Sequence, residues 1–145
     1  WHALPEVAAD EALWARVLAV RECVGPELER WRVATGAGAN LEAEVDLYAG
    51  QELFEALAPL AGELRFALIT SEVRLARETA RGPEAVHATL PGGDELRIAI
   101  RPAEHAKCPR CWHRREDVGS HPDHPELCGR CASNVAGPGE DRQWA

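Results

Sequence analysis

Four cysteines near the C-terminal end of the chain are the residues best suited to chemistry. They form the pattern C-x2-C-x16-C-x2-C, made by Cys108, Cys111, Cys128 and Cys131. Two residues between cysteines let both thiolates of a pair face one centre from a tight turn, and two such pairs supply the tetrahedral ligand set of Zn2+. Thiolates are soft ligands, so iron is the alternative metal, and magnesium and calcium are disfavoured. The spacing predicts one structural zinc ion.

Other uses of these residues stay open at this point. A disulfide framework is an alternative, although the short spacing within each pair and the lack of a secretory signal oppose it. A catalytic zinc is disfavoured because four thiolates leave no position for water or substrate. His121 or His124 is a minor alternative as ligand, and with His113 they are expected to hydrogen-bond within the loop. The fifth cysteine, Cys23, is expected to be a buried free thiol.

Basic and aromatic residues surround the first cysteine pair, and they are Lys107, Arg110, Trp112, Arg114 and Arg115. An exposed ring can stack on an unpaired base while guanidinium groups bind phosphate, so this cluster predicts a contact with single-stranded nucleic acid. The alternative is that Trp112 packs over the cysteines as their small core. Both descriptions hold if one face of the ring stays free.

The net charge is distributed unevenly along the chain. Its 145 residues carry a formal charge of -8. Residues 1–96 hold 8 Arg and 17 acidic residues, a net charge of -9, whereas residues 97–145 hold 8 basic and 7 acidic residues, a net charge of +1. The acidic total excludes a protein that holds nucleic acid by bulk charge. A small local contact at the basic cluster remains compatible with it.

Several absences limit the function classes. Methionine is missing even at position 1, so we expect a processed chain or a piece of a longer one. The single lysine, Lys107, excludes a GxxxxGK[ST] phosphate loop. No catalytic constellation stands out, and no apolar run approaches the roughly 18 residues of a membrane span. We therefore expect a cytoplasmic protein with no membrane partner, no catalytic residues of its own and no oligomer.

The hydrophobic pattern predicts an α+β fold. Apolar residues at steps of three and four predict an amphipathic helix over 11–34, or two in series, with a kink or break at Gly25-Pro26. Alternation over 41–48 predicts a strand with one buried face and one acidic, solvated face. We expect a short helix at 51–60, a buried strand at 64–70, a connector at 78–84, and a hairpin of strands 85–90 and 95–100. A zinc-ribbon or zinc-knuckle module would follow.

The C-terminal segments resemble a known family. "KCPRCWHRR" at 107–115 and "DVGSHPDHPELCGRCASNVAGPGEDRQWA" at 117–145 are similar to the C-terminal zinc-binding segment of bacterial isoleucyl-tRNA synthetases, including its ending at Trp144-Ala145. Residues 20–49 and 64–73 resemble the last helix of the anticodon-binding domain in that family and the small α/β segment after it. Residues 74–106 match least.

This resemblance implies three parts: the helical end of the anticodon-binding domain (1–38), a small α/β junction unit (39–104) and a four-cysteine zinc domain (105–145). It implies a C-terminal fragment that contacts the anticodon stem-loop of isoleucine tRNA, with Arg110 and Trp112 as carried-over contacts. The parent enzyme would use ATP and Mg2+ to activate isoleucine and charge the tRNA. The signatures of its catalytic domain are absent, so this class I ligase fragment should be inactive alone. A protein-interaction zinc ribbon and a glycosylase-type DNA finger are the alternatives.

Overall fold

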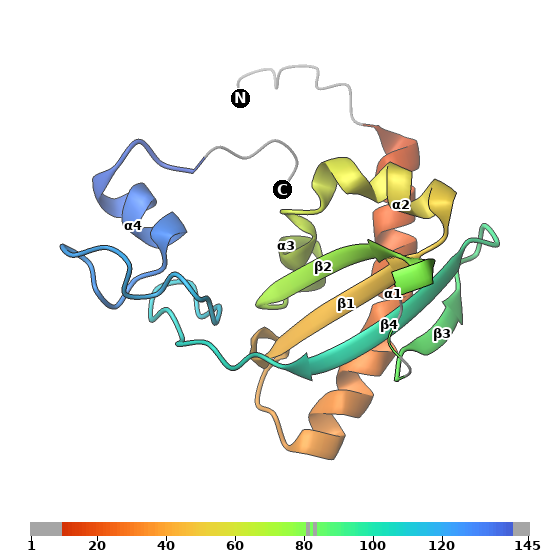
Figure 1. The fold of residues 1–145 in the computed structure, drawn as a ribbon, viewed down its shortest axis with the longest axis horizontal. Coiled ribbons are helices and arrows are strands. Elements are labelled where there is room, and N and C mark those ends of the chain that lie inside the picture. The colour runs from red at the N-terminus through yellow and green to blue at the C-terminus, as the bar shows by residue number, and fades with distance from the viewer. Residues whose placement is uncertain (1–9, 81, 83, 141–145) are drawn as a thin grey trace, which may run out of the picture.

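A mixed four-stranded sheet with helices on one face forms the larger part of the molecule, and a smaller cysteine-containing module lies beyond one end of the sheet (Figure 1). The computed structural model describes residues 10–80, 82 and 84–140. The predicted α+β class, with its N-terminal helix, hairpin and C-terminal module, is confirmed. The predicted ending at Trp144-Ala145 and the first nine residues of the predicted helical part lie outside the described residues.

Helix α1 covers Glu11–Thr35 and is continuous. Asp10 caps it, because its carboxylate accepts a hydrogen bond from the backbone N–H of Leu13 at 3.0 Å, and Gly36 ends it in the left-handed conformation. The break expected at Pro26 is absent. Pro26 is exposed, so water can hydrogen-bond to the carbonyl in the preceding turn that receives no N–H from proline. Val24 before Pro26 and Leu28 after it are buried, and their packing keeps both parts of the helix on the sheet. Of the two outcomes predicted at Gly25-Pro26, a kink or a break, the continuous helix excludes the break.

The sheet has the strand order β2-β1-β4-β3. Strand β1 (Ala43–Ala49) is central, pairs in parallel with β2 (Glu72–Arg77) and pairs antiparallel with β4 (Glu95–Pro102). Strand β3 (Val86–Thr89) forms the expected hairpin with β4. The alternating side chains of β1 place Val45 and Leu47 in the core with α1, so the predicted strand and its buried face are confirmed.

The segment between β1 and β2 differs from the prediction. Helix α2 (Gln51–Leu57) runs into a 3-10 turn (Ala58–Leu60), as expected, but residues 64–68 form helix α3 (Leu64–Leu68) instead of a strand. Leu64 and Leu68 are one helical turn apart and both are buried, which a short, mostly apolar run does not reveal. The strand of this region is β2, where Val73 and Leu75 alternate with charged residues.

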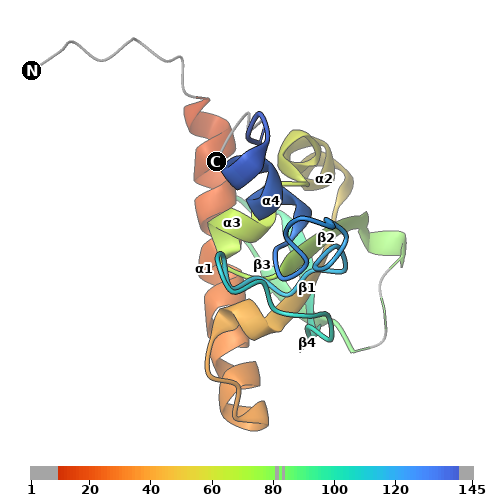
Figure 2. The same cartoon turned by 90° about the vertical axis from the view of Figure 1, so that its left-hand side faces the viewer.

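The other face of the sheet is charged, and it is not the freely solvated face that was expected. Glu44 and Asp46 of β1 point away from the core, yet both carboxylates are largely buried beneath arginine side chains of β2 and β4. Helices α1, α2 and α3 all lie on the opposite side (Figures 1 and 2). One face of the sheet therefore carries the core, and the other presents paired charges.

The cysteine module is built from an irregular loop and helix α4 (Gly129–Ala136). It has a small buried cluster of its own, separate from the main core, formed by Cys108, Leu127, Cys128, Cys131 and Ala132. Short 3-10 turns at Asn40–Glu42 and Glu78–Ala80 complete the described elements. Among the residues that the structure describes, none of the helices has the length and apolar character needed to cross a membrane.

Candidate metal centre

Two tight turns bring the four cysteines together. In the first, the backbone N–H of Trp112 donates to the carbonyl of Cys108 at 2.8 Å, and the N–H of Cys108 donates to the carbonyl of His113 at 2.9 Å. In the second, Cys128 precedes the first residue of α4 and Cys131 lies in the first turn of that helix. The helix N-terminus thus faces the sulfurs, which stabilises negative charge there.

The sulfur atoms form a set of the right size for one metal ion. All four Sγ atoms lie within 4.8 Å of one another, and Cys111 Sγ lies 3.7 Å from Cys128 Sγ. Four sulfurs at about 2.3 Å from a tetrahedral zinc ion are about 3.8 Å apart, so this spacing fits. All five cysteines are free thiols, so the disulfide alternative is not realised. Cys23 is half-buried on α1, apart from the cluster.

The protonation of the thiols favours a cation at their centre. Burial would raise the pKa of Cys108, but backbone N–H groups of Cys111, Cys128 and Arg110 outweigh it and lower that pKa to about 6. Burial, together with the negative charge of Cys111, raises the pKa of Cys128 to about 12. A cation at the centre of the cluster favours loss of the proton from each thiol, and four thiolates are the donor set that Zn2+ prefers.

Two arginines balance the charge of the sulfur cluster. Arg110 donates from Nη1 to Cys131 Sγ at 3.7 Å. Arg130 on α4 is more buried: burial would lower its pKa, but hydrogen bonding to the Cys111 thiolate and the carboxylate of Glu140 raise it. Partners of this kind orient metal ligands and tune their charge. Arg130 and Glu140 were not singled out from the sequence, although Arg130 lies between Cys128 and Cys131 and this position was a signal.

The histidines of the loop are not ligands in this arrangement. The group of side chains able to hold a metal contains only the four cysteines among the described residues. The ring of His113 is hydrogen-bonded through Nδ1 to the carbonyl of Cys111 at 3.1 Å and meets Phe66 edge-on, with ring centroids 5.7 Å apart. Burial lowers the pKa of His113, which disfavours the protonated ring. His121 is exposed and His124 is half-buried in the loop.

Trp112 projects from the first cysteine turn. Its side chain is 58% exposed and it is absent from the buried cluster around the cysteines, so the ring is not the core of the module. The backbone has φ of 67°, a conformation rare for a large residue, and the indole N–H donates to the carbonyl of Pro109 at 3.1 Å. Lys107 Nζ lies 5.0 Å from the ring centroid. The turn therefore fixes an aromatic ring at the surface with a cation beside it.

The remaining basic residues of the cluster differ in their contacts. Arg110 is exposed and its Nη1 donates to Cys131 Sγ, whereas Arg114 donates from Nη1 to the carbonyl of His105 at 3.2 Å. Arg115 forms an ion pair with Glu72 at the start of β2 and lies 4.0 Å from Asp117. Arg115 is thus already used within the protein, and its main role in the structure is to hold the module on the sheet.

The module is attached to the sheet through residues that the sequence did not single out. The Ser71 hydroxyl accepts a hydrogen bond from the Arg114 backbone N–H at 2.6 Å and donates to the carbonyl of Leu41 at 2.5 Å. Arg130 packs on the Phe66 ring at 5.1 Å from its centroid. The opposite charges of Arg115 and Glu72 were the only indication of this contact in the sequence. Their spacing along the chain does not show that they meet.

Comparisons with known proteins agree with this geometry. Residues 107–134 match the model of a zinc finger found in FPG and IleRS. The chain is 54% identical over 142 residues to isoleucine–tRNA ligase of Halorhodospira halophila, covering 98% of this chain and 15% of that protein. It is 51% identical over 136 residues to the ligase of Thioalkalivibrio sulfidiphilus (94% and 14%), and 47% identical over 150 residues to that of Pseudomonas aeruginosa (100% and 16%).

The chain thus spans about one seventh of the length of these relatives. The match covers nearly all of its residues, including the helix, the sheet and the cysteine module. These findings confirm the resemblance seen in the sequence: the chain matches the isoleucine–tRNA ligases as a segment that carries the zinc finger found in FPG and IleRS.

Proposed function

We propose that this chain is the C-terminal, tRNA-binding portion of an isoleucine–tRNA ligase. A structural zinc held by Cys108, Cys111, Cys128 and Cys131 would fix the surrounding loop against the anticodon stem-loop of isoleucine tRNA. The parent enzyme would work in the cytoplasm, activating isoleucine with ATP and Mg2+ and transferring it to the tRNA. The 145-residue chain, being about one seventh of its relatives in length, would lack the catalytic domain and be inactive alone.

The observation that carries this proposal is the geometry of Trp112. The residue follows a metal ligand directly, so the metal would set the direction of its ring. Lys107 lies beside the ring, Arg110 is exposed on the other side of Cys111, and the indole is exposed instead of buried. An aromatic platform with adjacent cations is the arrangement that binds unpaired bases and their phosphates.

Arg114 and Arg115 take a different part in the proposal. Their contacts with His105 and Glu72 hold the loop against the sheet, so we propose that both arginines position the loop. Only Arg114 would also contact a phosphate directly, through the N–H groups that His105 does not use. Lys107, Arg110 and Trp112 would contact the RNA itself. The remaining part of the synthetase would be the other partner of this segment.

Titration of the zinc-loaded chain with three nucleic acids tests the proposal. The labelled probes are isoleucine tRNA, the same tRNA with an altered anticodon and a DNA duplex, each measured by fluorescence anisotropy at several salt concentrations. We expect isoleucine tRNA to bind best, with weak affinity, because the chain carries a net charge of -8 and gains little from bulk electrostatics. Equal weak binding to all three would contradict the proposal, and preference for the duplex would favour the DNA-binding finger.

A further inference from the structure

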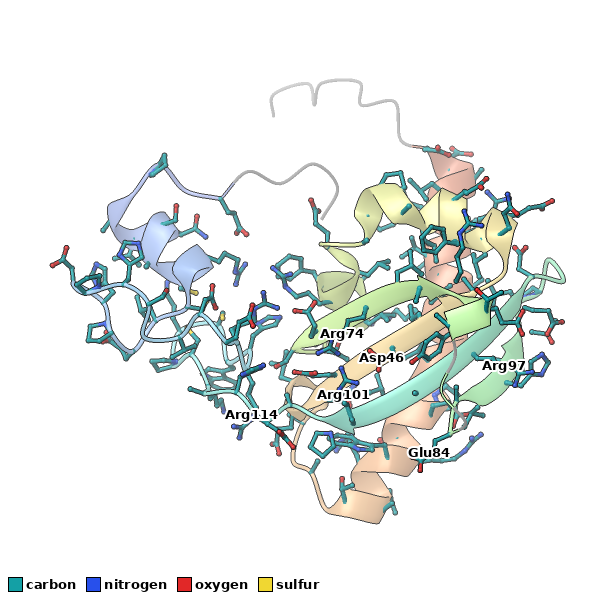
Figure 3. All side chains as sticks on the ribbon, in the orientation of Figure 1. Asp46, Arg74, Glu84, Arg97, Arg101 and Arg114 are labelled. Carbon is teal, nitrogen blue, oxygen red and sulfur yellow. The ribbon has the colours of Figure 1, made fainter. Side chains whose placement is uncertain are left out.

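The face of the sheet opposite the helices carries a layered set of charges (Figure 3). In the strand register, Asp46 of β1 is the partner of Arg74 in β2, and Glu44 of β1 is the partner of Arg101 in β4. Arg74 hydrogen-bonds to both carboxylates, at 3.2 Å for Asp46, and Arg101 does the same, at 2.7 Å for Asp46 and 3.2 Å for Glu44. Two carboxylates and two guanidinium groups thus form one closed network.

The network is asymmetric in its exposure to solvent. The side chains of Glu44 and Asp46 are 6% and 13% exposed, whereas those of Arg74 and Arg101 are 45% and 48% exposed. The negative charges lie against the sheet and the positive groups lie over them. The four charges cancel at a distance, but an approaching ligand meets the guanidinium groups first.

The arginines keep donors available for such a ligand. A guanidinium group has five N–H donors, and each of these two arginines uses two of them in the network. The carboxylates hold both groups in place before any ligand arrives, which reduces the entropy lost on binding. Fixed guanidinium groups with free, forked donors match the oxygens of a phosphodiester.

This surface is continuous with the loop of the cysteine module. Arg114 and Arg74 line one cleft of about 130 Å3, and Arg74 and Arg101 line a second cleft of about 220 Å3. Carboxylates line both clefts as well, Glu72 and Glu116 in the first and Glu104 in the second. The two clefts share Glu44, Arg74 and His105, so they form one path. At its other end, Arg114 pairs with Lys107 through a β-bridge, which places the path beside the Trp112 turn.

We propose that Arg74 and Arg101 form a second contact for RNA phosphates, on the uncovered face of the sheet and connected to the Trp112 loop through Arg114. This inference rests on the proposed tRNA-binding function and extends it. A strand whose base stacks on Trp112 would pass its backbone along the path, where oriented donors bind it at short range. RNA fits better than a protein partner because the path presents the oriented guanidinium donors of Arg74 and Arg101, and because it begins at the aromatic platform.

Single substitutions on the path test this inference. The probe is a fluorescent anticodon stem-loop RNA of isoleucine tRNA, titrated with the full 145-residue zinc-loaded chain at several salt concentrations. Arg74→Gln and Arg101→Gln should each weaken binding about fivefold at 0.1 M salt and reduce the slope of log K against log salt by about 0.7, the value for one phosphate contact on a single strand. Zinc content should stay unchanged.

A second variant guards against a loss of folding, because each glutamine removes a partner of Glu44. Ala99→Glu adds an acidic group opposite Asp46 on the same face and removes no existing bond. It should weaken RNA binding and lower the unfolding temperature slightly, because the new carboxylate lies opposite Asp46. Binding is therefore measured at a temperature where circular dichroism shows the variant to be folded. Arg30→Gln on α1 is the matched control, since Arg30 is 68% exposed on the helix that covers the other face of the sheet. It should leave RNA binding unchanged.

The outcomes separate this inference from the function on which it rests. Weaker binding by the path variants, with Arg30→Gln unaffected, supports the second contact. Unchanged affinity and salt slope in Arg74→Gln, Arg101→Gln and Ala99→Glu, together with weaker binding by Trp112→Ala, would overturn the second contact and leave the proposed function intact. Failure of the parent chain to bind the RNA at all would overturn both. An equal effect of Arg30→Gln would show general charge attraction and reject the path.

Discussion

At the scale of single residues, Trp112 combines an unfavourable backbone with an exposed ring. Neither feature helps the module to fold: a positive φ costs energy for a bulky residue, and an exposed indole buries little apolar area. The hydrogen bond to Pro109 and the cation of Lys107 hold the ring in that position. A residue kept in such a conformation at the surface is best explained by what it binds.

Substitution of Trp112 separates binding from structure. Trp112→Ala should weaken tRNA binding by about 1–3 kcal/mol, because a stacking platform is removed. Zinc content, measured by metal analysis of the purified variant, should not change. Trp112→Phe is the matched control, since it keeps an aromatic face and should recover part of the affinity. Loss of zinc in Trp112→Ala would instead show that the ring is mainly structural.

The residue scale is also where sequence and structure agree most closely. The C-x2-C pairs predicted a four-sulfur cluster, and the structure brings these sulfurs together, because spacing within a tight turn is a local property. The surroundings of the cluster were not predictable in the same way. Phe66 and Ser71 reach the module from the segment between β1 and β2, and nothing in their own sequence neighbourhood marks them.

At the scale of elements, the network on the uncovered face of the sheet links three strands. Burial would raise the pKa of Glu44, but the hydrogen bonds and charges of Arg74 and Arg101 outweigh it and lower that pKa. Because the folded pKa is below the unfolded one, ionised Glu44 stabilises the fold fully above the pKa of an ordinary glutamate, about 4.3. That stabilisation is lost as the pH falls through the folded pKa.

The pH dependence of stability measures this network. Glu44→Gln should lower the free energy of unfolding at pH 7 by about 1–2 kcal/mol, a value discounted for the partial exposure of the two arginines. The difference between Glu44→Gln and the parent chain should shrink as the pH falls below about 4, in urea unfolding followed by circular dichroism. Glu55→Gln is a control, because Glu55 is exposed on α2. A constant difference at all pH values would show that the charge of Glu44 does not stabilise the sheet.

Helix α3 and strand β2 are the elements that the sequence pattern did not predict correctly. The run LRFALIT at 64–70 is mostly apolar and too short for its periodicity to distinguish a strand from a helix, and burial against α1 decides in favour of α3. Strand β2 carried a readable alternation of Val73 and Leu75 with charged neighbours, but it was not assigned. The alternation of acidic residues in β1 was recognised. The arginines that pair with Asp46 lie 28 and 55 residues further along the chain, so these ion pairs were not predictable from local composition.

At the scale of the whole molecule, the chain has two buried clusters of different origin. The larger unites α1, the helices that follow β1, and the sheet. The smaller consists of cysteines with Leu127 and Ala132, which is too little apolar area to order the roughly forty residues around it. We therefore expect metal binding to supply most of the folding free energy of the module.

Removal of the metal tests whether the cysteine module folds separately from the main core. It also tests the predicted boundary between the α/β unit and the zinc domain near residue 105. Chelation should melt residues 105–135 and leave α1 and the sheet largely intact. Hydrogen exchange read out by mass spectrometry should show faster exchange in α4 and the cysteine turns, with protection retained in Val17–Leu28 and β1. Thiol alkylation of Cys108 should rise in parallel. A single cooperative loss of all protection would place the boundary elsewhere.

The shortness of the connection between the two clusters has one further consequence. Only residues 103–107 separate the end of β4 at Pro102 from the first metal ligand. A tether of that length keeps the module and the sheet at a high effective concentration, of the order of millimolar. Contacts as few as those of Ser71, Glu72 and Phe66 are then enough to seat the module in one orientation. After transient metal loss, the unfolded loop stays beside its docking site, and rebinding of a metal ion restores the same seating without a search through solution.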